Sequence, residues 1–211
     1  MTNPASHPPS KKRGRRLILA SASAARAKLL KAAGVSFAVR PAGIDEKVLK
    51  ATLKREGIGA EQAALALAER KARAISAVEP KALVIGCDQL LECDREWFDK
   101  PATRAAARAQ LLYLCGRSHR LATAAVVLEG GKLLWQDVSS PRLRMRRFSE
   151  AFLEDYLRKA KGTVQESVGG YRLEGPGAQL FESIEGDYFS VLGLPLLALL
   201  AFLRSQGVIA T

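Results

Sequence analysis

The sequence is poor in the residues that build metal clusters and disulfide frameworks. Its 211 residues include only three cysteines and two histidines. Cys87, Cys93 and Cys115 show no C-x-x-C spacing and leave one cysteine over, which fits a reducing cytoplasm better than a disulfide framework. Because His7 and His119 are the only imidazole ligands, we do not expect a structural zinc site.

Long apolar runs are also absent. The basic N-terminal stretch is followed by the apolar segment 17–20, which is only four residues long. A secretory signal needs a core of about 7–15 residues, so we do not expect export. The apolar segment 191–203 is too short to span a bilayer. The sequence therefore predicts a cytoplasmic protein without a membrane partner.

Acidic residues are scarcer than basic ones, 21 against 33, and the formal net charge is +12. The basic residues at positions 11, 12, 13, 15 and 16 lie in a stretch without acids. Such a surplus suits phosphate-rich partners, nucleotide or nucleic acid, and does not choose between them. Residues 1–16, with three prolines in 1–14, are predicted to be a disordered basic tail, and residues 17–211 a single domain.

A strand, a serine turn and a helix are predicted to open the domain. Leu17–Leu19 is a short apolar run typical of a buried strand. Ser21 and Ser23 stand where they could cap a helix, and Gly34 can end it. The free N–H groups of a helix N-terminus, with hydroxyls and the Arg26 guanidinium nearby, favour a phosphate. From this segment alone, however, an ordinary serine-capped helix is the better-supported interpretation.

Hydrophobic periodicity and turn residues predict the remaining elements. Strands are predicted over residues 36–40, 82–86, 121–128, 133–136, 142–147 and from 180, with a hairpin tip between residues 90 and 98. Helices are predicted over residues 61–77, 102–114 and 149–161, and a C-terminal helix is predicted to open at 192–195 with proline in its first turn.

Asp88 lies two residues after the predicted strand 82–86 and has apolar residues on both sides. Open α/β sheets place ligand chemistry at the ends of buried strands. The apolar flanks make a solvated loop acid the weaker interpretation, and a buried acid needs a charged or donor partner. We therefore favour a functional role for Asp88.

Four other polar residues allow two interpretations each. Asp45 and Glu46 could bind a divalent cation, or they could start the next helix, because acids suit a first turn. Lys71 lies within a predicted helix, where a lone lysine is almost always solvated at the surface. His119 is more often a hydrogen-bonded structural residue than a catalyst.

Taken in order, these features resemble the Maf family of nucleoside triphosphate pyrophosphatases over residues 17 to about 205. Each motif is weak alone, but their order makes the resemblance specific. It implies an α/β fold with a long twisted mixed sheet flanked by helices and two lobes around a nucleotide cleft. The motifs are Leu19-Ala20-Ser21-Ala22-Ser23-Ala24-Ala25-Arg26, Asp45-Glu46, Lys71-Ala72, Gly86-Cys87-Asp88-Gln89, Lys100-Pro101, Gly116-Arg117-Ser118-His119, Gly186-Asp187-Tyr188 and Val191-Leu192-Gly193-Leu194-Pro195.

The resemblance implies hydrolysis of a nucleoside triphosphate to a nucleoside monophosphate and pyrophosphate. Asp88 would accept a proton from the attacking water, and Glu46 and Asp88 would hold Mg²⁺ or Mn²⁺. Homodimers are usual in the family, and no nucleic-acid partner is expected. The triphosphate would be bound by Ser21, Arg26, Lys71 and Lys100.

Three positions resemble the 7-methyl-GTP branch of the family. Ala25 replaces an arginine, Gln89 stands where the dTTP/UTP branch has threonine, and Glu174 stands where that branch has glutamine. A carboxylate can accept hydrogen bonds from N1–H and the 2-amino group of guanine. Gln89 and Glu174 are therefore predicted to bind the substrate, which we expect to be 7-methyl-GTP.

Two alternatives remain open at this point. One is a dTTP/UTP pyrophosphatase of the same family. The motif also departs from the family pattern at Ala24, where proline is usual, and this departure could weaken the binding of phosphate. The other is a non-catalytic nucleic-acid-binding regulator of cell division, which the net charge and the basic tail favour. That second alternative leaves Glu46 and Asp88 without a role.

Overall fold

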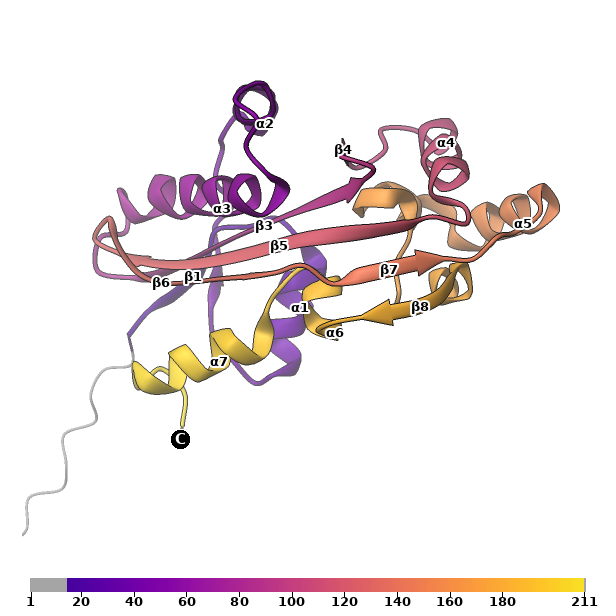
Figure 1. The fold of residues 1–211 in the computed structure, drawn as a ribbon. Coiled ribbons are helices and arrows are strands. Elements are labelled where there is room, and N and C mark those ends of the chain that lie inside the picture. The colour runs from indigo at the N-terminus through magenta and orange to yellow at the C-terminus, as the bar shows by residue number, and fades with distance from the viewer. Residues whose placement is uncertain (1–14, 211) are drawn as a thin grey trace, which may run out of the picture.

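The computed structural model describes residues 15–210, which form a mixed eight-stranded sheet with helices on both faces (Figure 1). The strand order is β2-β1-β3-β5-β7-β8, with β4 added beside β3 and β6 beside β5. The pairs β1–β2 and β1–β3 are parallel, and the other pairs are antiparallel. The predicted α/β class with a long mixed sheet is confirmed.

The elements follow in chain order. The strands are β1 Leu17–Leu19, β2 Ala38–Val39, β3 Leu83–Cys93, β4 Glu96–Phe98, β5 Ser118–Glu129, β6 Lys132–Ser139, β7 Arg142–Met145 and β8 Phe181–Glu185. The α-helices are α1 Ala24–Ala32, α2 Glu46–Arg55, α3 Ala60–Ser76, α4 Arg104–Leu114, α5 Glu150–Ala160, α6 Tyr188–Val191 and α7 Leu196–Ser205. The 3₁₀ turns are η1 Lys161–Gln165, η2 Val168–Gly170 and η3 Pro176–Leu180.

The predicted tail lies outside the described residues up to position 14. Its last two residues are described and contact the domain. Arg15 forms an ion pair of 2.6 Å with Glu129, and Arg16 one of 2.8 Å with Glu79. Between residues 15 and 210, no helix combines the length and apolarity that crossing a bilayer requires.

β3 departs most from the sequence prediction. It does not end before Asp88, as predicted, but continues through it to Cys93. The residues beyond Asp88 include Leu90 and Leu91, which are buried and pair with β5. This ladder with β5 continues the strand, so Asp88 lies in the middle of a long strand, and the prediction of a strand-end carboxylate was wrong. β2 is also shorter than predicted.

The two faces of β3 are covered by different helices. Val84 and Leu90 pack with α3 on one face, while Ile85 and Cys87 pack with α1 and α7 on the other (Figure 1). Side chains alternate along a strand, so Asp88 must point to the α3 face, as Val84 and Leu90 do. The partner of Asp88 must therefore come from α3, the helix that packs on this face of the sheet.

Gly86 lets α3 approach β3 closely. A Cβ atom at this position would lie 2.1 Å from the carbonyl oxygen of Ala68 and 2.8 Å from the Cβ of Ala72. No side chain larger than hydrogen fits there without moving the helix. Because Lys71 precedes Ala72 and Asp88 shares the face of Gly86, this contact sets the spacing between Lys71 and Asp88.

His119 is a buried, hydrogen-bonded residue in the core formed by α4, α5 and β7. Its side chain is packed beside the rings of Tyr171 and Phe181, and its Nε2 lies 2.7 Å from the Tyr171 hydroxyl oxygen. Burial lowers the pKa of His119 from its ordinary value of 6.5 to about 4. The ring is therefore neutral in the folded protein at pH 7.

Acid is expected to destabilise the fold through this ring. Between about pH 6.5 and 4 the unfolded chain protonates His119 while the folded chain does not, so the stability falls as the pH falls, by about 3 kcal/mol in total. We expect His119→Gln to reduce the acid loss by that amount. Urea unfolding of both proteins at pH 7, 5.5 and 4 measures it, and parallel pH profiles would contradict the assignment.

Candidate active site

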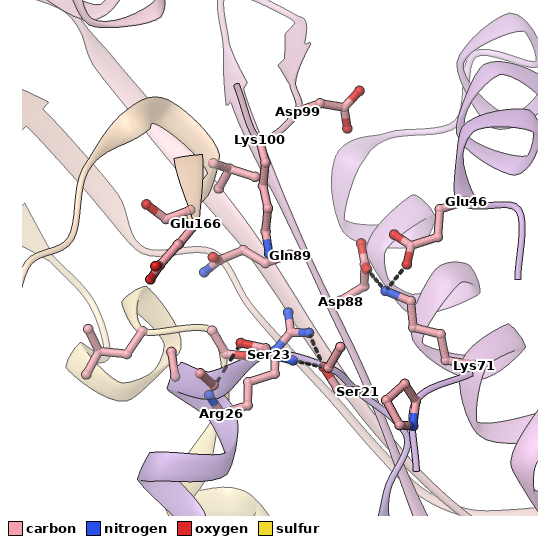
Figure 2. Close-up of a pocket in the computed structure, with 18 of the residues that line it drawn as sticks. Ser21, Ser23, Arg26, Glu46, Lys71, Asp88, Gln89, Asp99, Lys100 and Glu166 are labelled. Atoms are coloured by element: carbon pink, nitrogen blue, oxygen red, sulfur yellow. Dashed lines mark hydrogen bonds and ion pairs between the residues drawn. The ribbon is translucent and has the colours of Figure 1, made fainter. Parts of the chain in front are cut away.

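One cavity of about 910 Å³ is lined by all eight predicted site residues, which are labelled in Figure 2 except for Glu174. Its wall is built from the loop before α1, the start of α2, the middle of α3 and β3, and the loop before α4. The segments 166–174 and 191–193 close the other side. The predicted residues that line this cavity are Ser21, Arg26, Glu46, Lys71, Asp88, Gln89, Lys100 and Glu174.

Lys71 joins two carboxylates at the floor of the cavity. Its Nζ lies 2.5 Å from Asp88 Oδ1 and 2.9 Å from Glu46 Oε1. Lys71 is only 7% exposed and Asp88 only 4%, so the interpretation of Lys71 as a solvated helix lysine was wrong. A buried ammonium is stable only with charged partners. The two predicted metal-binding carboxylates are thus paired with the same lysine nitrogen (Figure 2).

Asp88 keeps one carboxylate oxygen free. Among the described residues, its buried Oδ2 has no hydrogen-bond partner, while Oδ1 is held by Lys71. A buried oxygen without a partner is costly, and such an atom is normally satisfied by water, an ion or a ligand. The orientation of Asp88 is thus fixed through one oxygen, and the other remains available for chemistry.

The two acidic residues at the start of α2, Asp45 and Glu46, make different contacts. Asp45 is the N-cap of α2, and its Oδ1 accepts hydrogen bonds from the backbone N–H groups of Lys47 and Val48 at 3.1 and 3.2 Å. Glu46, one residue on, instead turns its carboxylate to Lys71. The helix-start interpretation therefore holds for Asp45, and the site contains Glu46.

The residues present fit a divalent cation. Glu46 and Asp88 offer hard oxygen donors beside an unpartnered buried oxygen, which is the chemistry that Mg²⁺ and Mn²⁺ take. Within residues 15–210 there is no group of three or more His, Cys, Asp or Glu side chains placed to hold a metal ion. Magnesium is commonly bound by one or two carboxylates together with substrate phosphates and water, which is the arrangement this pair allows.

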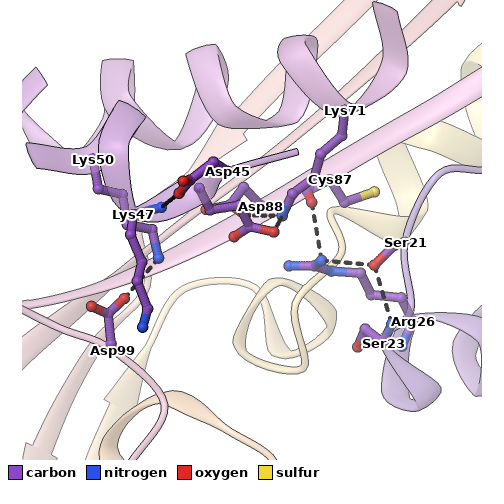
Figure 3. Close-up of polar contacts among 11 residues, drawn as sticks. Ser21, Ser23, Arg26, Asp45, Lys47, Lys50, Lys71, Cys87, Asp88 and Asp99 are labelled. Carbon is purple, nitrogen blue, oxygen red and sulfur yellow. Dashed lines mark hydrogen bonds and ion pairs between the residues drawn. The ribbon is translucent and has the colours of Figure 1, made fainter. Parts of the chain in front are cut away.

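Arg26 is buried beside the serine turn. Its Nη1 donates to Ser21 Oγ at 3.1 Å and to the Cys87 carbonyl at 3.0 Å, and its Nε donates to the Gly193 carbonyl at 2.7 Å. Ser23 caps α1 by accepting from the Arg26 backbone N–H at 3.4 Å. These contacts tie α1, β3 and the loop before α7 together, and Figure 3 draws those to Ser21 and Cys87. They hold the guanidinium at the cavity wall with Nη2 unused among the described residues.

Gln89 is held by the protein through its amide nitrogen. Nε2 donates to Thr123 Oγ1 at 2.8 Å and to the Ser190 carbonyl at 2.9 Å. These partners are acceptors, so the nitrogen is committed and the side-chain oxygen is the atom left for a ligand. The predicted substrate contact of Gln89 is therefore limited to accepting a hydrogen bond.

Glu174 is one of two carboxylates on a single guanidinium. Arg172 Nη2 lies 3.0 Å from Glu174 Oε1, and Arg172 Nη1 lies 2.9 Å from Glu166 Oε2. All three residues line the cavity. One arginine between two carboxylates leaves this wall with a net negative charge, and the second oxygen of Glu174 makes no bond to Arg172.

Two further lysines line the cavity near its acids. Burial lowers the pKa of Lys100 below its ordinary value, and the nearby charges of Arg26 and Lys71 add to this. For Lys50, burial acts in the same direction, but a hydrogen bond to Asp99 and the charges of Asp88 and Glu46 outweigh it and raise its pKa. Lys50 is therefore held in its charged form.

Sequence reasoning missed several residues of this cavity, namely Lys50, Asp99, Glu166 and Arg172. Two of them could have been found from spacing. Lys50 stands four residues after Glu46 and shares its helix face, and Asp99 precedes Lys100. Glu166 and Arg172 lie in an irregular segment whose path no periodicity describes.

Comparisons with known proteins show the family to which this chain is related. The profile of the family described as Maf-like protein matches residues 16–206. A "Nucleoside triphosphate pyrophosphatase" of Rhodospirillum rubrum is 51% identical over 92% of this chain and 96% of its own length, and one of Paramagnetospirillum magneticum is 52% identical over 90% and 98%. A "7-methyl-GTP pyrophosphatase" of Mesorhizobium japonicum is 46% identical over 92% of this chain and 98% of its own length.

Proposed function

Because this chain belongs to the Maf-like protein family, we propose that it hydrolyses 7-methyl-GTP to 7-methyl-GMP and pyrophosphate in the cavity around Asp88. The broader activity is that of a nucleoside triphosphate pyrophosphatase, the name that its relatives carry over nearly their whole length. The observation that carries the mechanism is the buried Asp88 carboxylate, which is fixed by Lys71 through one oxygen and free at the other.

Asp88 is proposed as the proton acceptor. The attacking water would donate to the free Oδ2, while Lys71 keeps the carboxylate in one orientation. A positioned carboxylate of this kind typically contributes about 10²–10⁴-fold to a rate. Glu46 and Asp88 would hold Mg²⁺ or Mn²⁺, which would lower the pKa of a bound water and neutralise phosphate charge.

Arg26 is proposed to bind phosphate oxygens through its unused Nη2. Its other two nitrogens are already bonded to Ser21, Cys87 and Gly193, so no rearrangement is needed when the triphosphate binds. Donors oriented in advance stabilise charge more effectively than mobile ones. Lys100, whose pKa is lowered by burial and by neighbouring cations, gains a compensating anion when a phosphate arrives.

The net negative charge of the wall formed by Glu166, Arg172 and Glu174 favours binding of a guanine base, and most of all of an N7-methylated one. The free oxygen of Glu174 can accept from N1–H or from the 2-amino group of guanine, and the 2-amino group has no counterpart in uracil or thymine. Methylation at N7 makes the base cationic, and a net negative wall favours that charge. The name of the relative from Mesorhizobium japonicum, 7-methyl-GTP pyrophosphatase, supports the same substrate.

A nucleotide panel tests the proposed substrate. Purified protein is assayed for pyrophosphate release from 7-methyl-GTP, GTP, UTP and dTTP with Mg²⁺ and with Mn²⁺. We expect kcat/KM to be highest for 7-methyl-GTP. Preference for dTTP and UTP would replace the proposal by the other branch of the family, and no release from any of the four would contradict the enzymatic function.

Glu174→Gln is expected to shift this preference. The amide keeps the size of the side chain but replaces one acceptor by a donor, which then faces the N–H groups of guanine. We expect the ratio of kcat/KM for 7-methyl-GTP over UTP to fall about tenfold or more. Glu182→Gln, an exposed substitution on β8, is the matched control. An unchanged ratio in Glu174→Gln would remove Glu174 from base recognition.

The cytoplasmic location and the homodimer stay predictions from the sequence and from the resemblance. Salt-dependent binding to duplex DNA that survives removal of residues 1–16 would favour the regulatory alternative. That experiment is independent of the nucleotide panel.

A further inference from the structure

A lysine and an aspartate meet across the mouth of the cavity. Lys50 extends from α2, and Asp99 lies in the loop between β4 and α4 (Figure 3). Lys50 Nζ lies 2.8 Å from Asp99 Oδ1, and both residues line the cavity. The Lys50 side chain is 19% exposed, whereas that of Asp99 is 71% exposed. The cation is thus held inside the cavity by an anion that stands in solvent.

The next turn of α2 offers a comparison within the same molecule. Lys54 Nζ lies 2.7 Å from Glu96 Oε2, so it also links α2 to the region of β4. Neither Lys54 nor Glu96 lines the cavity. Two ion pairs of the same kind therefore attach α2 to the region of β4, and only the Lys50 pair has its cation among the residues that line the cavity.

A bound triphosphate would bring negative charge into a cavity in which Lys71 is already paired. A nucleoside triphosphate carries about four negative charges, and Lys71 is already shared by two carboxylates. An exposed carboxylate holds a lysine weakly, by about 0–1 kcal/mol. Phosphate oxygens with a higher charge density form stronger charge-assisted bonds to an ammonium. Asp99 can therefore yield Lys50 to a polyphosphate without any change in the buried floor.

We propose that Lys50 is a phosphate-binding residue of this enzyme, which Asp99 holds in the free protein and yields to the polyphosphate chain of the substrate and to the pyrophosphate product. The assignment rests on the proposed triphosphate substrate but not on its base. It also explains why α2, a helix without a fully buried residue, carries a half-buried lysine toward the reaction centre. The charge of Lys50 is maintained by Asp99 and the acids at the floor.

Four variants of the full chain test this. Lys50→Met and Lys54→Met each remove one ammonium from α2, and Asp99→Asn and Glu96→Gln each remove the partner charge. For each protein, kcat and KM are measured on the best nucleotide of the panel, together with the inhibition constant of inorganic pyrophosphate. The melting temperature of each variant measures the loss of stability that follows from breaking an ion pair between α2 and the region of β4.

The expected results differ in sign. Lys50→Met should raise KM and the pyrophosphate inhibition constant about tenfold or more. Asp99→Asn should lower that inhibition constant about two- to threefold, because Lys50 is no longer held by the aspartate. Lys54→Met and Glu96→Gln should stay within about twofold of the unaltered protein, with melting shifts like those of the first pair.

Two outcomes overturn the proposal. If Lys50→Met and Lys54→Met change the inhibition constant equally, both ion pairs act only by attaching α2. If Asp99→Asn weakens pyrophosphate binding as Lys50→Met does, the pair is a structural link that phosphate does not replace. Failure of the proposed function is separate, since it would appear as an absence of pyrophosphate release by the unaltered protein.

Discussion

Replacement of Asp88 by asparagine is expected to lower kcat by about 10³-fold, within the range of a lost general base. Asparagine has the same shape, and its oxygen can still accept the hydrogen bond from Lys71. The buried position that Oδ2 occupies would then hold an amide nitrogen, which cannot take a proton from water. Nucleotide affinity, measured by calorimetry, is expected to stay within about fivefold, because Arg26 and the lysines are unaffected.

Asp45→Asn is the matched control for this variant. Asp45 lines the same cavity, but its carboxylate caps α2. Asparagine caps a helix about as well as aspartate, so pyrophosphate release should continue at close to the normal rate. Near-normal release by Asp88→Asn, on the other hand, would refute the role of Asp88 as proton acceptor.

The second large effect is expected from Lys71→Met, on stability as well as on activity. The variant leaves Asp88 buried beside Glu46 with no cation between them, and breaking a buried pair in this way costs about 3–5 kcal/mol. The carboxylate also loses the contact that orients it, so we expect kcat/KM to fall at least about 100-fold. Urea unfolding and steady-state kinetics measure the two losses.

A double-mutant cycle separates this pair from a general loss of packing. Lys71→Met with Asp88→Asn removes both charges, so the double variant should be more stable than Lys71→Met alone. Lys28→Met, at an exposed position of α1, should change stability by less than about 0.5 kcal/mol. Additive effects of the two substitutions would mean that Lys71 and Asp88 do not stabilise each other.

Local patterns in the sequence were sufficient for much of the framework. The short strand β1, the cap Ser23 and the helix α1 are all local features, because a run of apolar residues and a helix cap need only their neighbours in the chain. The helix α3 and the strands β5 and β6 follow for the same reason. The ordered motifs also assembled the residues of the cavity, since each could be recognised without knowing its distance from the others.

Other features depend on contacts between distant segments. The extent of β3 is set by pairing with β5, and this is why Asp88 lies inside the strand and not at its end. The burial of Lys71 depends on Gly86, which lets α3 approach β3. From the sequence, Gln89 was predicted to bind the substrate. In the structure its amide nitrogen donates a hydrogen bond to the carbonyl of Ser190, which is distant in the chain.

The sequence by itself determined the α/β class, the family and the eight predicted site residues that line the cavity, because short-range periodicity and motif order carry that information. Only the tertiary structure decided how those residues share their charges. Lys71 binds two carboxylates, Arg172 binds Glu174 and Asp99 holds Lys50. Partners such as Lys71 with Asp88 and Lys50 with Asp99 lie far apart in the chain, and electrostatic pairing depends on distance in space, which no local pattern records.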